Sequence, residues 1–166
     1  MKKEAVADVE FNRLIKELLE NETVKEMNQY FQHFDTTCYE HCYRASYYCY
    51  KVSKKLSLDY KSAARGAMLH DLFLYDWRKR LNGRKGLHAF THGKTSCQNA
   101  CKLFNLNDIE KDMIKRHMFP VTIIPPKTKE GFLLTLVDKY CTLIEFSEYI
   151  CSKFNKKKSR TVNNTF

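Results

Sequence analysis

Small and apolar residues recur in one segment of the chain at a spacing that few folds accommodate. Cys38, Cys42, Ala45, Cys49, Val52 and Leu56 follow one another at intervals of four, three, four, three and four residues. These intervals place all six side chains on one face of an α-helix, where small residues allow close packing against neighbours. The segment therefore predicts a helix in the core of a helical protein.

Helical periodicity extends over almost the whole chain, and only five glycines and three prolines in 166 residues interrupt it. The sequence predicts one all-α domain over residues 1–155, a bundle of about six to eight helices without a strand pair. Loops are expected at NGRKG (82–86) and PVTIIPPKTKEG (120–131). The helices are expected at about 4–20, from Asn21 or Thr23 to Phe31, at 38–56, at 60–73 behind Asp59, at 91–104, from Asn107 to before Pro120, and at 129–154.

The formal net charge is +10, and part of it comes from the segment 156–166, which we expect to be a flexible, basic and polar tail. Because no stripe of basic residues alternates with aromatic ones, nucleic acid is disfavoured as a partner. A basic surface would attract small phosphorylated substrates. The choice between monomer and homodimer stays open.

Two features missing from the sequence indicate the cellular compartment of the protein. There is no run of about 18 apolar residues and no signal-peptide core near residue 1, so we expect a cytoplasmic protein without a membrane partner. The seven cysteines are odd in number and include no CxxC pair, which favours reduced thiols and disfavours a thiolate zinc site.

Histidines and aspartates are expected on the inner faces of several helices. Asp71 follows Ala67 by four residues and Ala64 by seven, so its carboxylate should face the core, where a charge needs compensation. His70 flanks the same face. Similar spacing turns His41, His117 and Asp138 inward, whereas His92 is less clearly oriented. Imidazole and carboxylate groups together suit zinc, iron, manganese and similar divalent ions.

The order of these residues resembles the HD superfamily, all-helical metal-dependent proteins defined by a His, a His-Asp pair and a later Asp. The resemblance covers roughly residues 33–145 and extends to a six-ligand, two-metal version: His41, His70, Asp71, His92, His117 and Asp138. It implies that His41, His70, Asp71 and Asp138 hold one ion, and that Asp71 bridges to a second ion held by His92 and His117. One or two divalent ions (Fe, Mn, Zn, Mg, Co or Ni) are the expected cofactors.

Five residues are candidates for roles in catalysis and substrate binding. Asp71 and Asp76 are candidate catalytic groups, although Asp76 is equally well explained as a partner of Arg78 or Lys79. Arg44, His88 and Lys94 are candidates for binding a substrate phosphate, with surface ion pairs as the alternative for Arg44 and Lys94. If Thr91 is an N-cap, His88 lies outside the helix and contacts substrate.

Three functions fit these residues. The leading hypothesis is a metal-dependent phosphohydrolase that uses a metal-activated water on a phosphomonoester or nucleotide. The resemblance also allows a di-iron oxygenase that cleaves a C–C or C–P bond. The third hypothesis is a non-catalytic binding module whose ion is structural. An open coordination position facing a cavity would favour catalysis over the third reading.

Overall fold

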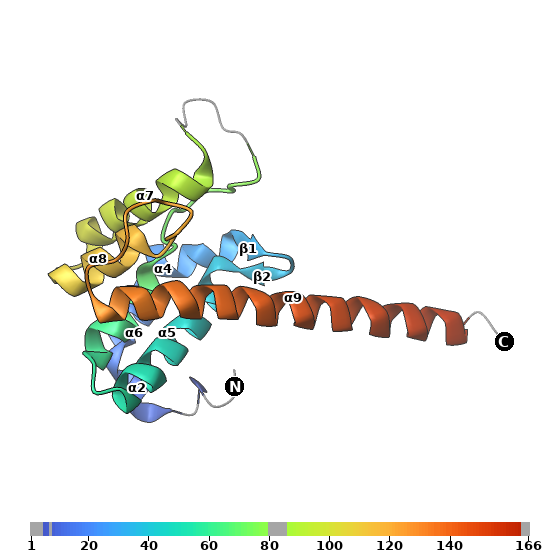
Figure 1. The fold of residues 1–166 in the computed structure, drawn as a ribbon. Coiled ribbons are helices and arrows are strands. Elements are labelled where there is room, and N and C mark those ends of the chain that lie inside the picture. Colours follow the sequence, from blue (N-terminus) through green and yellow to red (C-terminus); the bar gives the residue numbers. More distant parts are fainter. Residues whose placement is uncertain (1–4, 7, 80–85, 164–166) are drawn as a thin grey trace.

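The computed structural model describes residues 5–6, 8–79 and 86–163, and the described chain is mostly helical and packs as a single domain. The predicted all-α architecture is confirmed, with one small hairpin added. Figure 1 shows the elements: α2 (Val9–Leu14), α3 (Lys16–Glu20), α4 (Glu22–Lys25), the 3₁₀ helix η1 (Glu26–Gln29), β1 (Phe31–His33), β2 (Thr36–Thr37), α5 (Cys38–Lys55), α6 (Tyr60–Leu69), α7 (His88–Leu103), α8 (Asp108–Arg116) and α9 (Lys129–Asn163).

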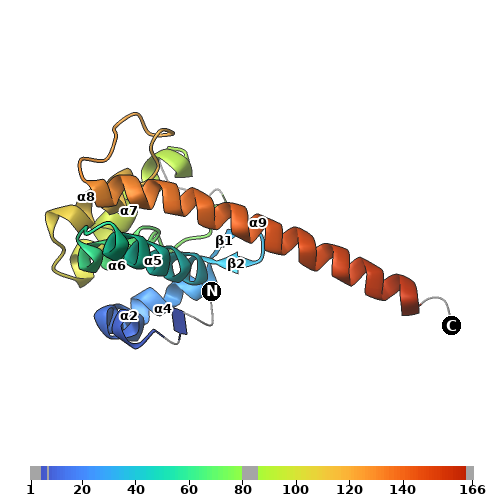
Figure 2. The ribbon, with the colours of Figure 1, turned by 60° about the horizontal axis from the view of Figure 1, so that its bottom comes forward.

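Helices α5 and α6 form the middle of the domain. In Figure 2 they lie between α9 on one side and α2 and α4 on the other. The N-terminus of α5 is fixed by a capping box, in which the Thr37 hydroxyl accepts from the Glu40 amide and the Glu40 carboxylate accepts from the Thr37 amide. Cys38, Cys42, Ala45 and Cys49 of the predicted seam are buried on α5, whereas Val52 is partly buried and Leu56, directly after the helix, is 58% exposed. The carboxylate of Asp59 caps α6 as predicted.

The hairpin was not predicted. Strands β1 and β2 are antiparallel, with Phe31 opposite Thr37 and His33 opposite Thr36. Phe34 turns the chain with a φ of 52°, a left-handed conformation that bulky residues seldom adopt, and its ring contacts Phe146 and Tyr149 of α9. The prediction that the second helix reaches Phe31 is therefore wrong.

Several helix ends also differ from the predicted ones. The helix expected over 4–20 is interrupted at Ile15, between α2 and α3, and α6 ends at Leu69 instead of Phe73. Helix α7 begins at His88, so Thr91 is not an N-cap. Most of the loop predicted at 82–86 lies outside the described residues.

Helix α9 is the longest element. It packs along the domain at its N-terminal end and then extends away from it in both ribbon views (Figures 1 and 2). It reaches Asn163 and so includes most of the segment 156–166 that was expected to be a tail; residues 164–166 lie outside the described part. None of the helices in the described chain has the length and apolar character needed to cross a membrane.

Candidate metal centre

The structure brings six buried His and Asp side chains together from five helical segments. His41 lies on α5, His70 and Asp71 lie at the end of α6, and Asp138 lies on α9. His92 of α7 and His117, directly after α8, complete the group. Every one of the six is at most 8% exposed. The helices that the sequence analysis assigned to these residues thus converge on one place.

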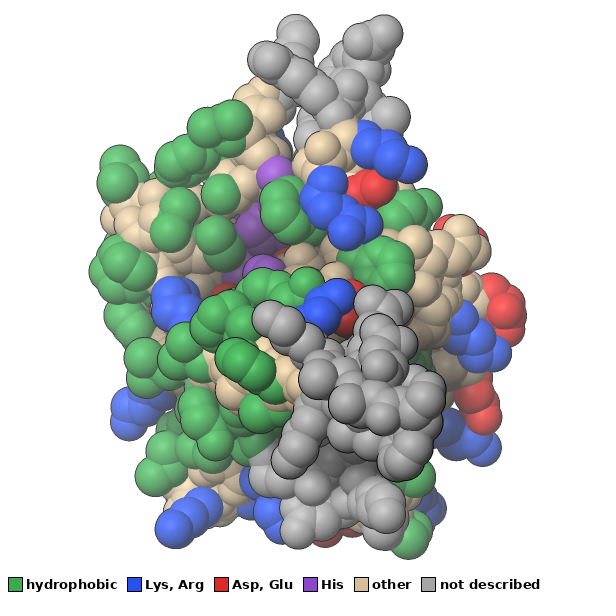
Figure 3. Space-filling view, turned by 90° about the vertical axis from the view of Figure 1, so that its right-hand side faces the viewer, with side chains coloured by type: hydrophobic (Ala, Val, Ile, Leu, Met, Phe, Trp, Pro, Cys, Tyr) green, Lys and Arg blue, Asp and Glu red, His purple; other side chains and the backbone are tan. Residues whose placement is uncertain are grey.

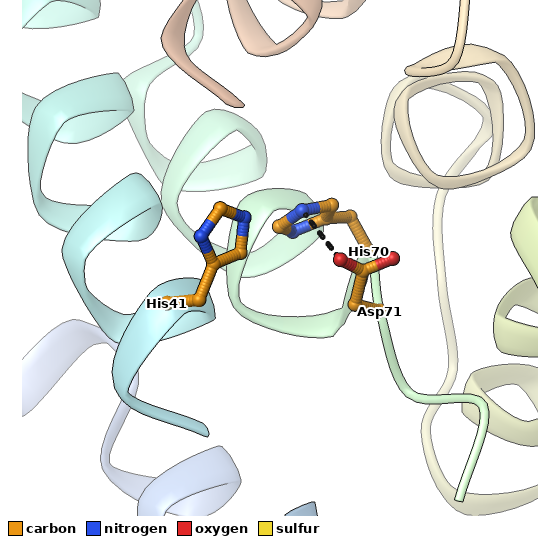
Figure 4. Close-up of side chains that lie close together, drawn as sticks. All are labelled: His41, His70 and Asp71. Atoms are coloured by element: carbon orange, nitrogen blue, oxygen red, sulfur yellow. Dashed lines mark ion pairs between the residues drawn. The ribbon is translucent and has the colours of Figure 1, made fainter. Parts of the chain in front are cut away.

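The first of two triads that can hold a metal ion consists of His41, His70 and Asp71. Figure 4 shows the two imidazole rings turned toward each other, with the Asp71 carboxylate beside His70. His70 Nε2 lies 3.3 Å from Asp71 Oδ2, and Asp138 Oδ1 lies 3.0 Å from His41 Nε2 and 3.7 Å from His70 Nε2. Asp138 therefore borders this triad.

The second triad consists of Asp71, His92 and His117. The two Nε2 atoms of His92 and His117 are 2.8 Å apart, and Asp71 Oδ1 lies 3.2 Å from the first and 3.6 Å from the second. Asp71 belongs to both triads and directs a different oxygen to each of them. One carboxylate thus lies between two groups of potential ligands.

Three of the imidazoles are oriented by their own helices. The Nδ1 atoms of His70, His92 and His117 lie 2.7, 2.8 and 2.9 Å from the carbonyl oxygens of Ala67, His88 and Ile114. A nitrogen at this distance from a carbonyl must donate, so Nδ1 carries the proton and the other nitrogen, Nε2, faces the cluster. Metal-binding histidines in proteins are typically held in this way.

Two neutral imidazoles cannot share their close Nε2 contact without a cation between them. Burial and the neighbouring His92 lower the pKa of His117 to about 3, so His117 is neutral. Burial alone would lower the pKa of His92, but its hydrogen bond with Asp71 raises it, so without a metal ion a proton on His92 Nε2 lies between the two nitrogens, which are 2.8 Å apart. A metal ion would replace this proton. Two nitrogens that each lie about 2.1 Å from one ion are separated by about 3.0–3.4 Å at ligand angles of about 90–109°, so an outward shift of about 0.2–0.6 Å would let both nitrogens bind the same ion. The donors therefore fit a metal ion.

Two other atoms of the cluster are buried without a hydrogen-bond partner: His70 Nε2 and Asp71 Oδ1. Burial by itself disfavours charge on both groups, but their mutual attraction outweighs it. The pKa of His70 is accordingly raised well above its usual range, and that of Asp71 is held well below its own. Without an ion, a proton supplies the positive charge at this place, so metal binding should release protons.

Glu145 is a member of the cluster that the sequence analysis missed. Both of its carboxylate oxygens lie 3.1 Å from His41 Nδ1, and the side chain is fully buried. Burial alone would lower the pKa of His41, yet hydrogen bonds with Asp138 and Glu145 raise it to about 10. Glu145 follows Asp138 by seven residues, so its helical spacing was a signal that it shares the same inner face.

Gln32 was missed as well. Its side-chain amide donates to Asp71 Oδ2, and Gln32 is carried by β1 of the hairpin. His33, interpreted from the sequence as structural, lines the cavity beside the cluster and contacts the ring of His41 edge-on at 5.5 Å.

A cavity of about 320 Å³ opens beside the cluster. Figure 3 shows histidine side chains inside a hollow that hydrophobic and basic side chains border. Asp71, His92, His117 and Asp138 reach this cavity, whereas His41 and His70 are not among its lining residues. Its other walls are formed by Gln32, His33, Trp77, His88, Ala89, Met118, Val121, Lys139 and Thr142.

The four other candidates occupy different places. His88 lines the cavity; it stacks on Trp77 and on His92, with ring centroids 5.4 and 4.4 Å apart, and its Nδ1 lies 3.0 Å from the Tyr75 hydroxyl. Since α7 begins at His88, the inference that this residue lies outside the helix is wrong. It nevertheless lines the cavity beside the His/Asp cluster.

Asp76, Arg44 and Lys94 are not lining residues of this cavity. Asp76 pairs with Arg78, with 3.2 Å between Oδ1 and Nε, as in the alternative reading of the sequence. Arg44 Nη2 pairs with Glu148 at 2.8 Å and borders a second cavity between α5 and the N-terminal segment. Lys94 lines a third cavity, and Val121 lines both this cavity and the first one. Lys139 is the cation that does line the first cavity.

Comparison of the chain with protein families, with curated proteins and with solved structures finds no match in any of the three. The site is thus described by its own residues: a buried His/Asp cluster that can hold metal ions, next to an open cavity.

Proposed function

We propose that the chain is a metal-dependent phosphohydrolase of the HD type, acting on a phosphomonoester or nucleotide. One observation carries the proposal: Asp71, which the two triads share, lines an open cavity together with His92 and His117 of the second triad. Structural metal sites are closed by protein ligands, whereas catalytic ones keep a position for water or substrate. The cavity therefore favours catalysis over a purely structural ion.

The proposed role of each residue follows from its position in the site. Asp71 and the inward Nε2 atoms of the histidines would hold one or two divalent ions, with Asp138 beside His41. Ions bound there would lower the pKa of a water molecule and offset the charge of the phosphoryl oxygens. The hydrogen bonds from Nδ1 to backbone carbonyls keep the imidazoles in position before an ion or substrate arrives.

The cavity walls support a phosphate ester with an organic group. Lys139 Nζ donates to two neutral carbonyl oxygens, those of Phe119 and Thr135, so its contacts leave its charge available to a phosphate. Trp77 and His88 form a stacked aromatic wall, and Met118 and Val121 add apolar surface that limits access of water. Lys139 thereby takes the phosphate-binding role that the sequence suggested for Arg44 and Lys94.

The apolar character of the walls also favours a second candidate, the di-iron oxygenase, because Lys139 is the one cation among the lining residues. Iron bound in both triads, together with O₂ uptake on a substrate without phosphate, would support this alternative. Activity with manganese, magnesium or cobalt in the absence of O₂ would exclude it.

The test combines metal analysis with phosphate release. Protein purified without chelator is analysed for metal, then assayed on a panel of phosphomonoesters and nucleotides with added Mn, Mg, Co or Fe. We expect metal-dependent phosphate release that Asp71→Asn abolishes. Asp76→Asn is the matched control, because Asp76 is a nearby aspartate outside the cavity, and it should keep activity. A metal-loaded protein that is inactive on the whole panel would refute the hydrolase.

A further inference from the structure

The outer face of α9 carries an apolar stripe that the rest of the described chain leaves largely uncovered. It consists of Leu136, Tyr140, Leu143, Ser147, Ile150 and Phe154, which we call the α9 seam; Ser147 is its one polar member, and Ile150 is partly buried. Leu136 is 68% exposed, Tyr140 51%, Leu143 66% and Phe154 70%. Large apolar side chains are seldom exposed together in this number on one helix face, and such a patch marks an interaction site.

The spacing of the seam indicates what covers it. Its residues follow one another at intervals of four, three, four, three and four, the rhythm with which one helix packs along another in a coiled coil. The same sequence of intervals results when the seam is read from either end. Two copies of α9 running in opposite directions therefore match: Leu136 meets Phe154, Tyr140 meets Ile150, and Leu143 meets the small Ser147.

Charge favours the antiparallel direction as well. The basic run KKKSR, at 156–160, follows the last seam residue, Phe154, in the sequence. A parallel pair would bring the two like-charged runs to the same end of the dimer, whereas an antiparallel pair would bring them to opposite ends. The heptad spacing of the seam thus indicates pairing with a second copy of α9, and the like charges favour the antiparallel direction.

The exposed area is sufficient for a dimer. The seam is flanked by Phe132 and Phe146, which are 45% and 47% exposed. Together these side chains expose on the order of 700 Å² per copy, close to the roughly 800 Å² per partner of a standard interface. We propose that the protein is a homodimer formed by antiparallel pairing of α9 along this seam.

The seam lies on the side of α9 opposite the candidate metal centre, which Asp138 and Glu145 contact from the inner face of the helix. This inference does not depend on the proposed hydrolase, since the seam would pair whether or not the site binds metal.

The test is the mass of the full chain in solution, measured by light scattering over about 1–200 µM. We expect twice the 19.7 kDa of one chain. Leu143→Glu and, separately, Leu136→Glu should weaken dimerisation by about 100-fold or more, because pairing would bury an unpaired carboxylate. Leu56→Glu is the control: Leu56 is 58% exposed and lies outside the seam, so this variant should stay dimeric.

Circular dichroism and melting temperature establish that the variants remain folded, as expected for substitutions at side chains more than half exposed. A wild type that is monomeric at 200 µM, or a dimer that neither seam variant weakens, would overturn the proposal. The orientation has its own test through the exposed Cys151. In the antiparallel pair the two Cys151 residues lie about 18 Å apart along the helices, so mild oxidation should not join them. Rapid Cys151–Cys151 crosslinking would overturn the antiparallel arrangement.

Discussion

Replacing Glu145 with glutamine should weaken metal binding although Glu145 is not itself part of either triad. Both carboxylate oxygens lie 3.1 Å from His41 Nδ1, so the anion fixes the ring and directs Nε2 toward the cluster. Glutamine keeps the shape and can still accept one hydrogen bond, but it removes the charge that makes His41 a stronger ligand. The substitution therefore isolates electrostatics from packing.

The expected size follows from outer partners of metal-binding histidines, whose removal typically reduces metal affinity by about 10- to 100-fold, or about 1.4–2.7 kcal/mol. The upper part of this range is expected here, because Glu145 is fully buried and water cannot replace it. The matched control is Glu148→Gln, one turn further along α9, where a 58% exposed carboxylate pairs with Arg44 outside the cluster.

The assay is competition with a coloured chelator for manganese, zinc or ferrous iron, carried out on both variants and the wild type. Glu145→Gln should lose at least tenfold in affinity, whereas Glu148→Gln should stay within about twofold. Equal affinities for the two variants would refute the role of Glu145 and the involvement of His41 in metal binding.

Three further predictions concern the fold around the site. Gly93→Ala should cost about 2 kcal/mol of stability and lower Tm by about 4–8 °C in thermal unfolding, because a Cβ would lie 3.0 Å from the backbone oxygens of Ile114 and Lys115. At Gly66 a Cβ would meet mainly the flexible Met113 side chain, so Gly66→Ala should cost less. An equal loss of stability in the two variants would contradict the reasoning. Asp59→Ala should cost about 1 kcal/mol of stability at pH 7 through loss of the α6 cap. Burial alone would raise the pKa of Asp59, but hydrogen bonds from Ser62 and Lys61 lower it, so the stabilisation by Asp59 is present above pH 4 and is lost as pH falls through the lowered pKa. The difference in Tm between variant and wild type should therefore narrow at low pH, and a constant difference would count against this origin. A thiol reagent should modify Cys101 and Cys151 quickly and the five buried cysteines only on unfolding, since burial hinders access and raises the pKa of Cys141 to about 12; fast reaction of more than two thiols would disagree with the structure.

The sequence was sufficient to predict which residues lie on the inner faces of the helices. Asp71 could be placed because Ala64 and Ala67 precede it at helical intervals, and Asp138 because Leu134 and Cys141 flank it in the same way. These residues obey the period of an α-helix, and the period alone decides which side of the helix faces the core. Glu145 obeys it too and was accessible to the same reasoning.

Other features had no comparable signal in the sequence. The hairpin turns at Phe34, whose left-handed backbone would normally suggest glycine or asparagine, so the turn could not be recognised from residue type. Helix α7 begins after Leu87, which provides no side-chain cap, and the start was therefore placed too late, at Thr91. Whether Arg44 and Lys94 face the cavity depends on how helices pack against each other, which single-helix periodicity does not determine.

The unequal burial of the two triads has a kinetic consequence. His41 and His70 are 0% exposed and do not line the cavity, whereas His92 and His117 do. An ion bound between His41 and His70 could reach the cavity only past Asp71 or Asp138, which line it. The inner ion should therefore exchange with solvent more slowly than an ion held by His92 and His117. Isotope exchange should then proceed in two phases, a fast one for the outer ion and a slow one for the inner ion.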